Sequence, residues 1–422
     1  MTIAERNAAN SPPLGRDGQF ARLRNETFDL AIIGGGINGA AIARDASLRG
    51  LRVALIDRSD FAGATSSHSS KLIHGGLRYL PQGQLRLVYH ALRERERLRR
   101  VTAPHLVSPI RFLFPFRAGR HPGRIAMTAG LVLYDLFART PSGERHRRLS
   151  SGAVRELEPA LATEGLRGGA VYYDGWGDDA RLTIENIIDA AIHGAAIANY
   201  AEVQGLVHKD GRLDALAVRD METDDHFALR ARSFINASGP WLDRLRLMDD
   251  PAAKPNVRLT KGVHLVVSAE RVPVKNALVL TDQAGRIIFV MPHGGWTLIG
   301  TTDADFNGDP ASVAADAADV DYLVGIVNDA FPVAHLAARD VAYRFAGLRV
   351  LPGNEGGRRP SAVSREEVIV ESASGLLSIG GGKLTTHRAI AEKIVDRVLK
   401  RLGRPWQRSP TRTLPLPGAR PS

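Results

Sequence analysis

The most constraining feature of this sequence is an apolar strand that runs directly into a glycine-rich turn. Residues 28–33 form a largely apolar run, which is typical of a parallel strand buried on both faces. Gly34, Gly36 and Gly39 follow in a Gly-x-Gly-x-x-Gly pattern, and small residues then continue the chain as a helix. Such a turn lets backbone amides approach a pyrophosphate at the positive end of the helix.

The chain after this helix completes a nucleotide-binding unit. The helix is predicted to end at Gly50, and a second buried run over residues 51–56 leads to Asp57. A carboxylate there can accept hydrogen bonds from a ribose diol, and it would repel the 2′-phosphate of NADP. Glycine triplets also occur in ordinary turns, but strand, helix, second strand and acid in register favour a dinucleotide site.

Composition limits the chemistry of the chain. With 422 residues it is long enough for two domains. It contains no cysteine, which excludes disulfides, thiolate zinc sites, cysteine-ligated iron–sulfur clusters and a catalytic thiol. No cluster of metal-ligating residues stands out, so no metal site is predicted. Any redox chemistry is therefore expected to depend on a bound organic cofactor.

The strongly basic balance points to anionic partners. A net charge of +11 and a pI near 10.1 favour nucleic acid, a lipid surface or a small phosphorylated substrate. Because no nucleic-acid-binding motif is present, no nucleic acid partner is expected. No apolar run reaches about 18 residues, and residues 1–25 have no secretion-signal core. We expect a cytoplasmic protein, with peripheral attachment to the inner face of the cell membrane as an option.

Residues 64–80 follow the nucleotide-binding unit and are dense in hydroxyls, glycines and cations. They are either a polar surface loop or a second stretch of phosphate and cofactor contacts. Residues 32–41 and 64–80 resemble the FAD-dependent glycerol-3-phosphate dehydrogenases of the aerobic, quinone-linked type, and the resemblance continues at 261–264 and 299–303. It implies FAD as the cofactor and a D-amino-acid-oxidase-like α/β flavoprotein fold, in which a Rossmann-like domain is interleaved with an antiparallel β-rich substrate domain.

The predicted domain organisation follows this resemblance. We expect a flexible leader over 1–25, a discontinuous FAD-binding domain over 26–108, 176–250 and 345–402, a substrate domain over 109–175 and 251–344, and a tail over 403–422. Members of the resembled family continue into a helical C-terminal domain, which this sequence is expected to lack. A homodimer is a further option.

The resemblance also implies the site residues. The expected cofactor contacts are Gly34, Gly36, Gly39, Asp57, Thr65, Ser66, Ser70, Lys71, Leu72, Val203, Ser238, Gly239, Gly381, Gly382, Lys383, Leu384 and Thr385. Val203 would reach the adenine, and Ser238 and Gly239 lie in a small-residue turn after a buried strand. The glycine-rich segment that contains Gly381 and Gly382 again leads into a helix, over residues 389–402.

By the same resemblance, the reaction would be oxidation of glycerol 3-phosphate to dihydroxyacetone phosphate, with electrons passed to quinone or another acceptor. Oxidising a secondary alcohol requires a hydride acceptor, a base and fixed positive charge near the oxygen. His264 is the candidate base, although a strand histidine can also be a packed core residue. The remaining assignments are Arg349 and Lys383 at the C2 oxygen, Arg365 at the phosphate, and Arg78 and Tyr79 in the substrate pocket.

Several alternatives remain open from the sequence. The same fold could oxidise another hydroxy acid or an amino acid, use oxygen as the acceptor, or bind flavin without turnover. Residues 125–137 are apolar and flanked by arginines, so this predicted helix could lie in a membrane interface or be buried.

Overall fold

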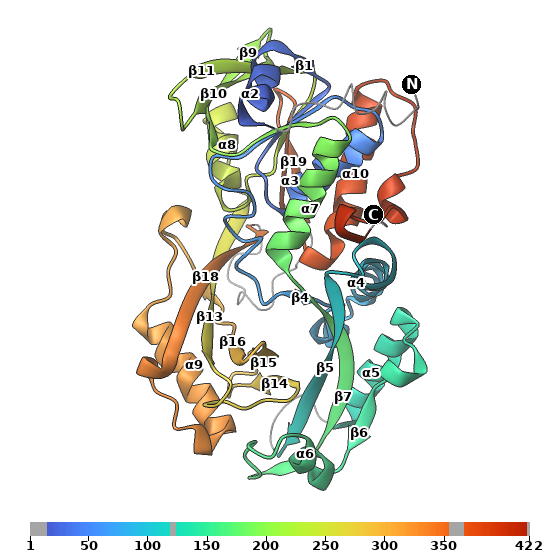
Figure 1. The fold of residues 1–422 in the computed structure, drawn as a ribbon, viewed down its shortest axis with the longest axis vertical. Coiled ribbons are helices and arrows are strands. Elements are labelled where there is room, and N and C mark those ends of the chain that lie inside the picture. The colour runs from blue at the N-terminus through green and yellow to red at the C-terminus, as the bar shows by residue number, and fades with distance from the viewer. Residues whose placement is uncertain (1–14, 119–123, 354–366, 420–422) are drawn as a thin grey trace.

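The computed structural model describes residues 15–118, 124–353 and 367–419, which form two lobes stacked along the long axis of the molecule (Figure 1). The upper lobe is built on a six-stranded sheet with strand order β19-β20-β12-β2-β3-β8. All neighbouring strands in it are parallel except β19 at the edge, which runs antiparallel to β20. The strands are β2 (Leu30–Ile33), β3 (Val53–Ile56), β8 (Ala196–Ala198), β12 (Phe234–Asn236), β19 (Glu367–Glu371) and β20 (Leu376–Gly381).

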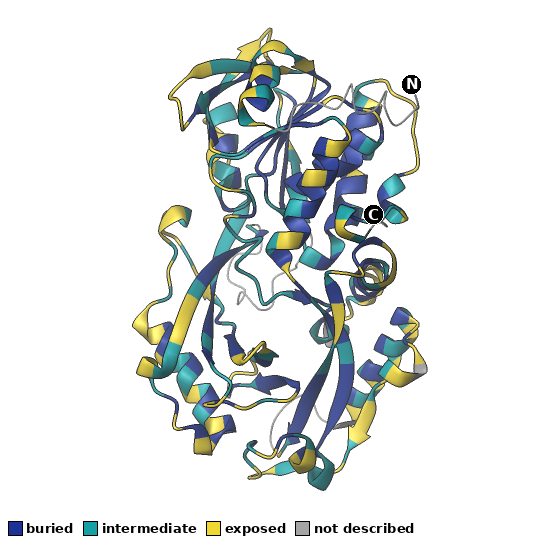
Figure 2. Ribbon diagram, viewed as in Figure 1, coloured by how far each residue is buried: buried dark blue, intermediate teal, exposed yellow. Residues whose placement is uncertain are grey.

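Helices and a second sheet enclose this parallel sheet on its two faces. Three helices pack together over one face: α3 (Ile37–Leu48), α7 (Asp179–Ile192) and α10 (His387–Arg401). The other face carries a four-stranded sheet of β1 (Thr27–Phe28), β11 (His226–Ala231), β10 (Arg212–Asp220) and β9 (Ala201–Lys209), with α8 (Leu242–Asp249) beside it. Both faces of the central strands are therefore buried, as their continuous apolar runs predict (Figure 2).

The lower lobe is dominated by a ten-stranded sheet. Eight of its strands follow the order β17-β13-β16-β15-β14-β5-β7-β4, and the other two, β18 and β6, pair with β13 and β7. Its strands are β4 (Leu72–Ile73), β5 (Val107–Arg117), β6 (Arg147–Leu149), β7 (Leu166–Gly177), β13 (Val257–Ser268), β14 (Ala277–Thr281), β15 (Ile287–His293), β16 (Trp296–Gly300), β17 (Ala304–Asp305) and β18 (Val341–Pro352). Its helices are α4 (Leu85–Arg97), α5 (Arg124–Ala138), α6 (Ser151–Leu157) and α9 (Ala317–Ala330). The mostly antiparallel sheet fits the β-rich substrate domain predicted from the sequence.

The predicted domain boundary at residue 345 is wrong. Strand β18 pairs with β13 from Val341 to Pro352, so residues 345–352 continue the lower sheet instead of starting the last FAD-binding segment. The long strand crosses from one lobe towards the other, and β20 begins only at Leu376 (Figure 1). Sequence periodicity marks a strand but does not reveal which sheet it joins, because the pairing partner is remote in the chain.

The predicted flexible leader is partly wrong. Residues 15–25 are described and include the helix α2 (Arg16–Asn25), which buries Phe20 and Leu23 against the four-stranded sheet. The side chain of Arg16 reaches Asp220 with an Nη2–Oδ1 distance of 2.5 Å. Residues 1–14 of the expected leader lie outside the described part of the chain. Tertiary contacts therefore order a segment whose local sequence carries little apolar periodicity.

The predicted tail is packed against the rest of the protein as far as residue 419. Ser409, Thr411 and Leu416 are buried, and the backbone amide of Leu416 donates to the carbonyl oxygen of Thr102 at 2.7 Å. The amide of Gly418 donates to Glu185 on α7 at 3.1 Å. Residues 403–419 thus form a strap over α3, α7 and α10, held mainly by polar contacts that a proline- and arginine-rich sequence does not reveal.

None of the helices in the described residues has the length and apolar character needed to cross a bilayer.

Candidate active site

The early glycine turn connects β2 to α3 so tightly that only glycine fits. Gly34 has φ +109°, and a Cβ added at Gly39 would lie 1.9 Å from the carbonyl oxygen of Gly34. Gly36 is the N-cap of α3 and supplies no side-chain cap. The next amide, that of Ile37, donates to the Ser66 hydroxyl at 2.9 Å. The positive end of the helix is therefore lined by backbone groups and one hydroxyl. Such an end is a favourable place for a pyrophosphate.

A hollow opens where the carboxyl ends of the parallel strands meet this turn. This is the edge at which open α/β sheets bind their ligands. Eight of the predicted cofactor residues line it: Gly34, Gly36, Asp57, Thr65, Ser66, Val203, Ser238 and Gly239. They come from four separate segments of the sequence, so the fold brings together what the motifs predicted one by one.

Asp57 both faces the hollow and holds the turn. Its Oδ2 accepts the amide of Gly35 at 2.6 Å, and its Oδ1 accepts the amide of Ser59 at 2.8 Å. Burial raises the pKa of this carboxyl against the hydrogen bonds that lower it. A carboxylate has about four lone-pair sites, so acceptor capacity remains for a ribose hydroxyl.

Sequence reasoning missed several residues of this hollow. Arg58 and Trp241 both line it, and the Arg58 guanidinium carbon lies 4.1 Å from the centroid of the Trp241 ring. The indole Nε1 of Trp241 is buried and has no hydrogen-bond partner within the described residues. Arg244 and Met248 on α8 complete this wall. The position of Arg58 directly after Asp57 was an available signal, whereas α8 joins the wall only through the tertiary fold.

The late glycine turn lies against the early one. Gly381 is the last residue of β20 and Gly382 follows it, with φ values of +68° and +77°. The Asn38 side-chain amide, one residue inside α3, donates to the carbonyl oxygen of Gly381 at 3.1 Å. Thr385, a few residues on, exchanges hydrogen bonds of 3.0 Å each with the backbone amide and carbonyl of His74. Both predicted glycine segments therefore meet at the N-terminal end of α3.

Other predicted cofactor residues direct their side chains into the protein. The ammonium of Lys71 pairs with the buried Asp179 at 2.5 Å, and the side chain of Leu72 is buried in β4. The Thr65 hydroxyl, although Thr65 lines the hollow, donates to the carbonyl of Leu348 at 2.7 Å. These side chains fix the loop of residues 64–80, which leaves its backbone to meet a ligand.

His264 lies on β13 beside this loop and is 2% exposed. Its ring stacks on Phe345 with a centroid distance of 4.9 Å, and its Nε2 is 2.7 Å from the Ser70 hydroxyl. Its Nδ1 is buried without a partner within the described residues. Burial and the nearby cations Arg349 and Lys71 lower the pKa of His264 to about 3. At neutral pH the imidazole is therefore uncharged and able to accept a proton.

Arg349 lies on β18, next to β13, and its guanidinium is oriented by the protein. Its Nη2 donates to the Thr301 hydroxyl at 2.8 Å, and its Nη1 lies 3.2 Å from Asp303 Oδ1. A Cβ added at Gly262 would lie 2.4 Å from Arg349 Nη2, so a larger residue there would displace this guanidinium. Thr301 and Asp303 belong to the family-like segment 299–303, but their role as partners of Arg349 was not predicted.

Arg78, Tyr79 and Lys383 form a second cationic group. The hydroxyl of the buried Tyr79 accepts from Arg78 Nη2 at 2.9 Å, and the ammonium of Lys383 lies 4.3 Å from the centroid of the Tyr79 ring. A cation over an aromatic face is an attractive arrangement. The contact brings Tyr79, a predicted substrate residue from the early part of the chain, together with Lys383 from the late part. Arg365, the predicted phosphate ligand, lies outside the described residues.

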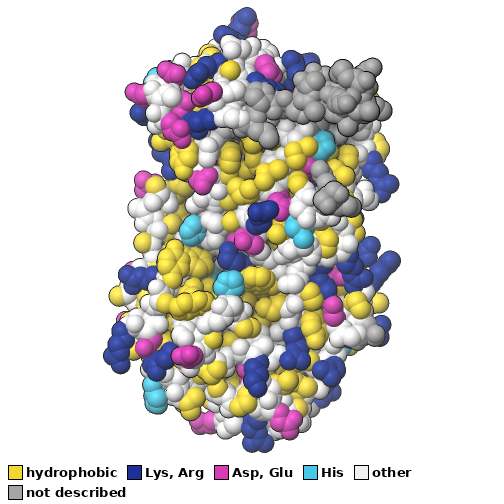
Figure 3. All heavy atoms as spheres, viewed as in Figure 1, with side chains coloured by type: hydrophobic (Ala, Val, Ile, Leu, Met, Phe, Trp, Pro, Cys, Tyr) yellow, Lys and Arg dark blue, Asp and Glu magenta, His cyan; other side chains and the backbone are white. Residues whose placement is uncertain are grey.

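The residues present fit a dinucleotide such as FAD. The N-terminal end of α3, which has no side-chain cap, suits a pyrophosphate, Asp57 suits a ribose, and the buried Trp241 Nε1 is a donor at the wall of the hollow. Figure 3 shows apolar and histidine side chains gathered at the level where the two lobes meet. Within the described residues, no group of three or more acidic or histidine side chains is arranged to hold a metal ion. The fold and the site thus define a flavin-dependent oxidoreductase.

Comparison with known proteins gives the same class and a narrower family. The family model "FAD dependent oxidoreductase" matches residues 29–397. An aerobic glycerol-3-phosphate dehydrogenase of Staphylococcus aureus is 41% identical over 382 residues, which are 90% of this chain and 68% of that protein. The chain therefore belongs to the FAD-dependent oxidoreductases and, within them, to the family of the aerobic glycerol-3-phosphate dehydrogenases.

Solved structures agree with this assignment. The glycerol-3-phosphate dehydrogenase from Bacillus halodurans complexed with FAD has a TM-score of 0.76 and 34% identity, and the match covers 94% of this chain and 69% of that chain. The L-alpha-glycerophosphate oxidase from Mycoplasma pneumoniae, with FAD bound, has a TM-score of 0.70, with 93% and 99% covered. At 20% identity, this second likeness shows the shared fold alone. FAD is accordingly the cofactor of the present fold.

Proposed function

We propose that this protein oxidises sn-glycerol 3-phosphate to dihydroxyacetone phosphate. The observation that carries the proposal is the 41% identity over 90% of the chain to an aerobic glycerol-3-phosphate dehydrogenase. The grouping of His264 and Arg349 on neighbouring strands supports it, since a base and a fixed cation are what alcohol oxidation needs. FAD, when bound, supplies the hydride acceptor.

In this proposal His264 takes the hydroxyl proton. Its uncharged imidazole has one nitrogen engaged by Ser70 and the other, Nδ1, free of a partner within the described residues. A group with a pKa near 3 is a weak base. It can take the proton only if the pKa of the substrate hydroxyl is lowered as well. Arg349, whose charge helps to lower the His264 pKa, would favour the developing negative charge on the C2 oxygen in the same way.

The phosphate of the substrate is assigned to Arg365, with Arg78 and Tyr79 in the same pocket and Lys383 at the C2 oxygen. Forked guanidinium donors suit a phosphate dianion, and each charge-assisted hydrogen bond contributes on the order of 1.5 to 3 kcal/mol. The contact of Lys383 with Tyr79 supports placing these cations in one pocket.

An anaerobic titration tests the proposal. Purified holoenzyme is mixed with glycerol 3-phosphate, glycerol, a 2-hydroxy acid and an amino acid, and bleaching of the flavin absorbance is followed. Bleaching by glycerol 3-phosphate alone is expected. Bleaching by an unphosphorylated acid alone would instead assign an oxidase of another substrate, and a yellow protein that none of these reduces would be a flavin-binding protein without turnover.

We further propose quinone as the electron acceptor. Its support is the name of the curated relatives, aerobic glycerol-3-phosphate dehydrogenase, whose type the sequence resembles. Reoxidation of the reduced protein should be at least tenfold faster with a soluble quinone analogue than with air-saturated buffer. Equal rates would favour oxygen as the acceptor.

A peripheral membrane contact, on the inner face of the cell membrane, is the second part of this proposal. One side of α5 is buried, with Leu131 and Tyr134 in the core, but the other side exposes Ile125, Val132 and Leu136 at 87%, 54% and 69%. Leu85 and Tyr89 on the adjoining α4 extend this apolar surface, and the exposed Arg139, Arg145, Arg147 and Arg148 follow it. An apolar helix face next to arginines suits an anionic lipid interface.

Vesicle binding tests this contact. The wild type should sediment with phosphatidylglycerol vesicles, and Leu136→Glu should reduce the bound fraction several-fold. Val333→Glu is the matched control, because Val333 is 72% exposed in the lower lobe but remote in the sequence from both helices. If the wild type stays in the supernatant, or if both variants lose binding equally, the contact does not occur through α5.

A further inference from the structure

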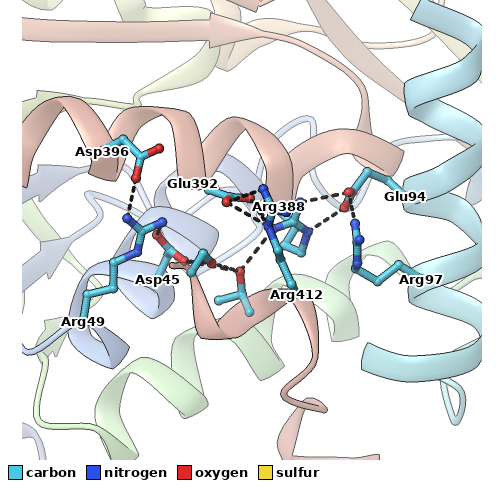
Figure 4. Close-up of polar contacts among 10 residues, drawn as sticks. Asp45, Arg49, Glu94, Arg97, Arg388, Glu392, Asp396 and Arg412 are labelled. Carbon is cyan, nitrogen blue, oxygen red and sulfur yellow. Dashed lines mark hydrogen bonds and ion pairs between the residues drawn. The ribbon is translucent and has the colours of Figure 1, made fainter. Parts of the chain in front are cut away.

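A buried network of charges involves the first turns of α10, the helix that follows the late glycine turn in the sequence (Figure 4). Arg388 is the second residue of α10 and is 6% exposed. Its Nε and Nη2 donate to the two carboxylate oxygens of Glu94 at 2.6 and 2.8 Å. Its Nη1 donates to Glu392, one turn further along α10, at 2.8 Å. The guanidinium is thus fully engaged in a forked arrangement, which fixes both distance and orientation.

Further charged groups surround this pair. Glu94 also pairs with Arg97 on its own helix, and Glu392 pairs with Arg412 of the C-terminal strap at 2.7 Å. Burial opposes the charge of Arg388, but the hydrogen bond and charge of Glu94, followed by those of Glu392, outweigh it and raise the pKa of Arg388. Arg388 therefore stays charged, although it is largely shielded from water.

The two partners belong to segments that carry opposite sides of the site. Glu94 lies on α4, which begins shortly after the 3₁₀ segment Leu77–Gln82 that contains Arg78 and Tyr79. Arg388 lies at the start of α10, which follows Lys383 and the short 3₁₀ segment Leu384–Thr386. Tyr79 and Lys383 are themselves in contact, with 4.3 Å between the ammonium and the ring centroid. The ion pair and this contact thus join the same two segments at two points.

We propose that Arg388 and Glu94 are positioning residues, whose forked pair holds the Lys383 turn against Tyr79 and so shapes the late-turn side of the FAD site. The alternative is that the pair stabilises the fold without affecting the site. The proposal rests on the FAD site and not on the choice of substrate. Its readouts are therefore the affinity for FAD and the flavin reduction potential, which remain measurable whatever alcohol the enzyme oxidises.

The test compares conservative variants of the pair with a matched control on the same helix. Arg388→Lys keeps the charge but removes the fork, and Glu94→Gln keeps the shape but removes the charge. Each should weaken FAD binding about tenfold in a fluorescence titration of the apoprotein and shift the flavin potential. The control is Asp396→Asn, which removes the partner of Arg49 (2.5 Å) further along α10. It should lower the melting temperature while leaving FAD affinity and potential unchanged.

A double-variant comparison shows whether the pair acts through Lys383. In a Lys383→Met background, Arg388→Lys should change FAD affinity by less than twofold, because the group that it positions is already absent. If Arg388→Lys and Glu94→Gln lower only the melting temperature, with FAD affinity within twofold of the wild type, the pair is structural and the proposal is overturned. Should Glu94→Gln fail to fold, the Arg388→Lys comparison still decides the question.

Discussion

The side-chain amide of Asn38 donates a hydrogen bond to the carbonyl oxygen of Gly381 at 3.1 Å, across 343 positions in the sequence. Asn38 stands at the start of the helix after the early glycine turn, and Gly381 belongs to the late one. This one contact therefore joins the two segments that are expected to enclose the cofactor. It also shows why neither segment could form the site alone.

Asn38→Ala removes this contact without filling the site. Because one hydrogen bond contributes about 0.5 to 1.5 kcal/mol, FAD affinity should fall roughly two- to tenfold. The measurement is the dissociation constant from flavin fluorescence quenching. Asn328→Ala is the matched control, since Asn328 exchanges two hydrogen bonds with Leu336 in the lower lobe. It should cost stability while leaving the dissociation constant unchanged; a change equal to that of Asn38→Ala would contradict the prediction.

Gly39→Ala should disrupt the early turn. The added methyl would lie 1.9 Å from the Gly34 carbonyl oxygen, so α3 has to move away from β2. Overpacking of this kind costs about 1 to 3 kcal/mol, and we expect loss of bound FAD as well as a lower midpoint of urea unfolding. Gly325→Ala in α9 is the control, because nothing lies within 4 Å of its Cβ. It should stabilise the protein by about 0.5 to 1 kcal/mol.

Burial of His264 makes stability depend on pH. Its pKa is lowered to about 3, so between this value and the ordinary value near 6.5 the unfolded chain binds a proton that the folded protein excludes. The contribution of His264 to the free energy of unfolding should therefore be fully present above about pH 6.5. It should fall as the pH is lowered, by up to about 1.4 kcal/mol per pH unit. His387, with a pKa lowered to about 4, adds in the same direction.

His264→Asn tests that assignment. The free energy of unfolding of the apoprotein, measured with urea, should depend less steeply on pH in the variant between about pH 5 and about pH 6.5. Above about pH 7 the pH dependence of the two proteins should coincide. The same low pKa means that flavin reduction by substrate should have no acid limb from His264 near pH 6.5. An identical slope in both proteins would show that this imidazole does not exclude the proton.

Arg349→Met should have two effects. Loss of the proposed charge-assisted contact to substrate should reduce kcat/KM about tenfold or more, since such bonds are worth roughly 1.5 to 3 kcal/mol. Removal of its charge should also raise the pKa of His264, which NMR titration of the apoprotein measures. Arg344→Met, an exposed arginine on the same strand, is the control and should leave both quantities unchanged. A His264 pKa that does not rise in Arg349→Met would contradict the electrostatic argument.

The sequence by itself determined the local nucleotide-binding unit. An apolar run, three glycines at fixed spacing and the acid at Asp57 are neighbours in the chain, and their geometry follows from backbone sterics and helix periodicity. The resemblance located the late turn at Gly381 and Gly382 in advance. The structure then placed Asp57 and Ser238 in one hollow, because the carboxyl ends of parallel strands meet at one edge of the sheet.

The tertiary structure alone decided everything that depends on contacts between distant residues. Helix α2 and the strap over 403–419 are ordered because Phe20, Leu23 and Leu416 are buried by other elements, and local periodicity carries no record of such burial. The low pKa of His264 and the pairing of Arg388 with Glu94 have the same origin. Desolvation and Coulomb interactions act through space. The sequence could therefore name His264 but not determine its charge state, and it singled out neither Arg388 nor its partner.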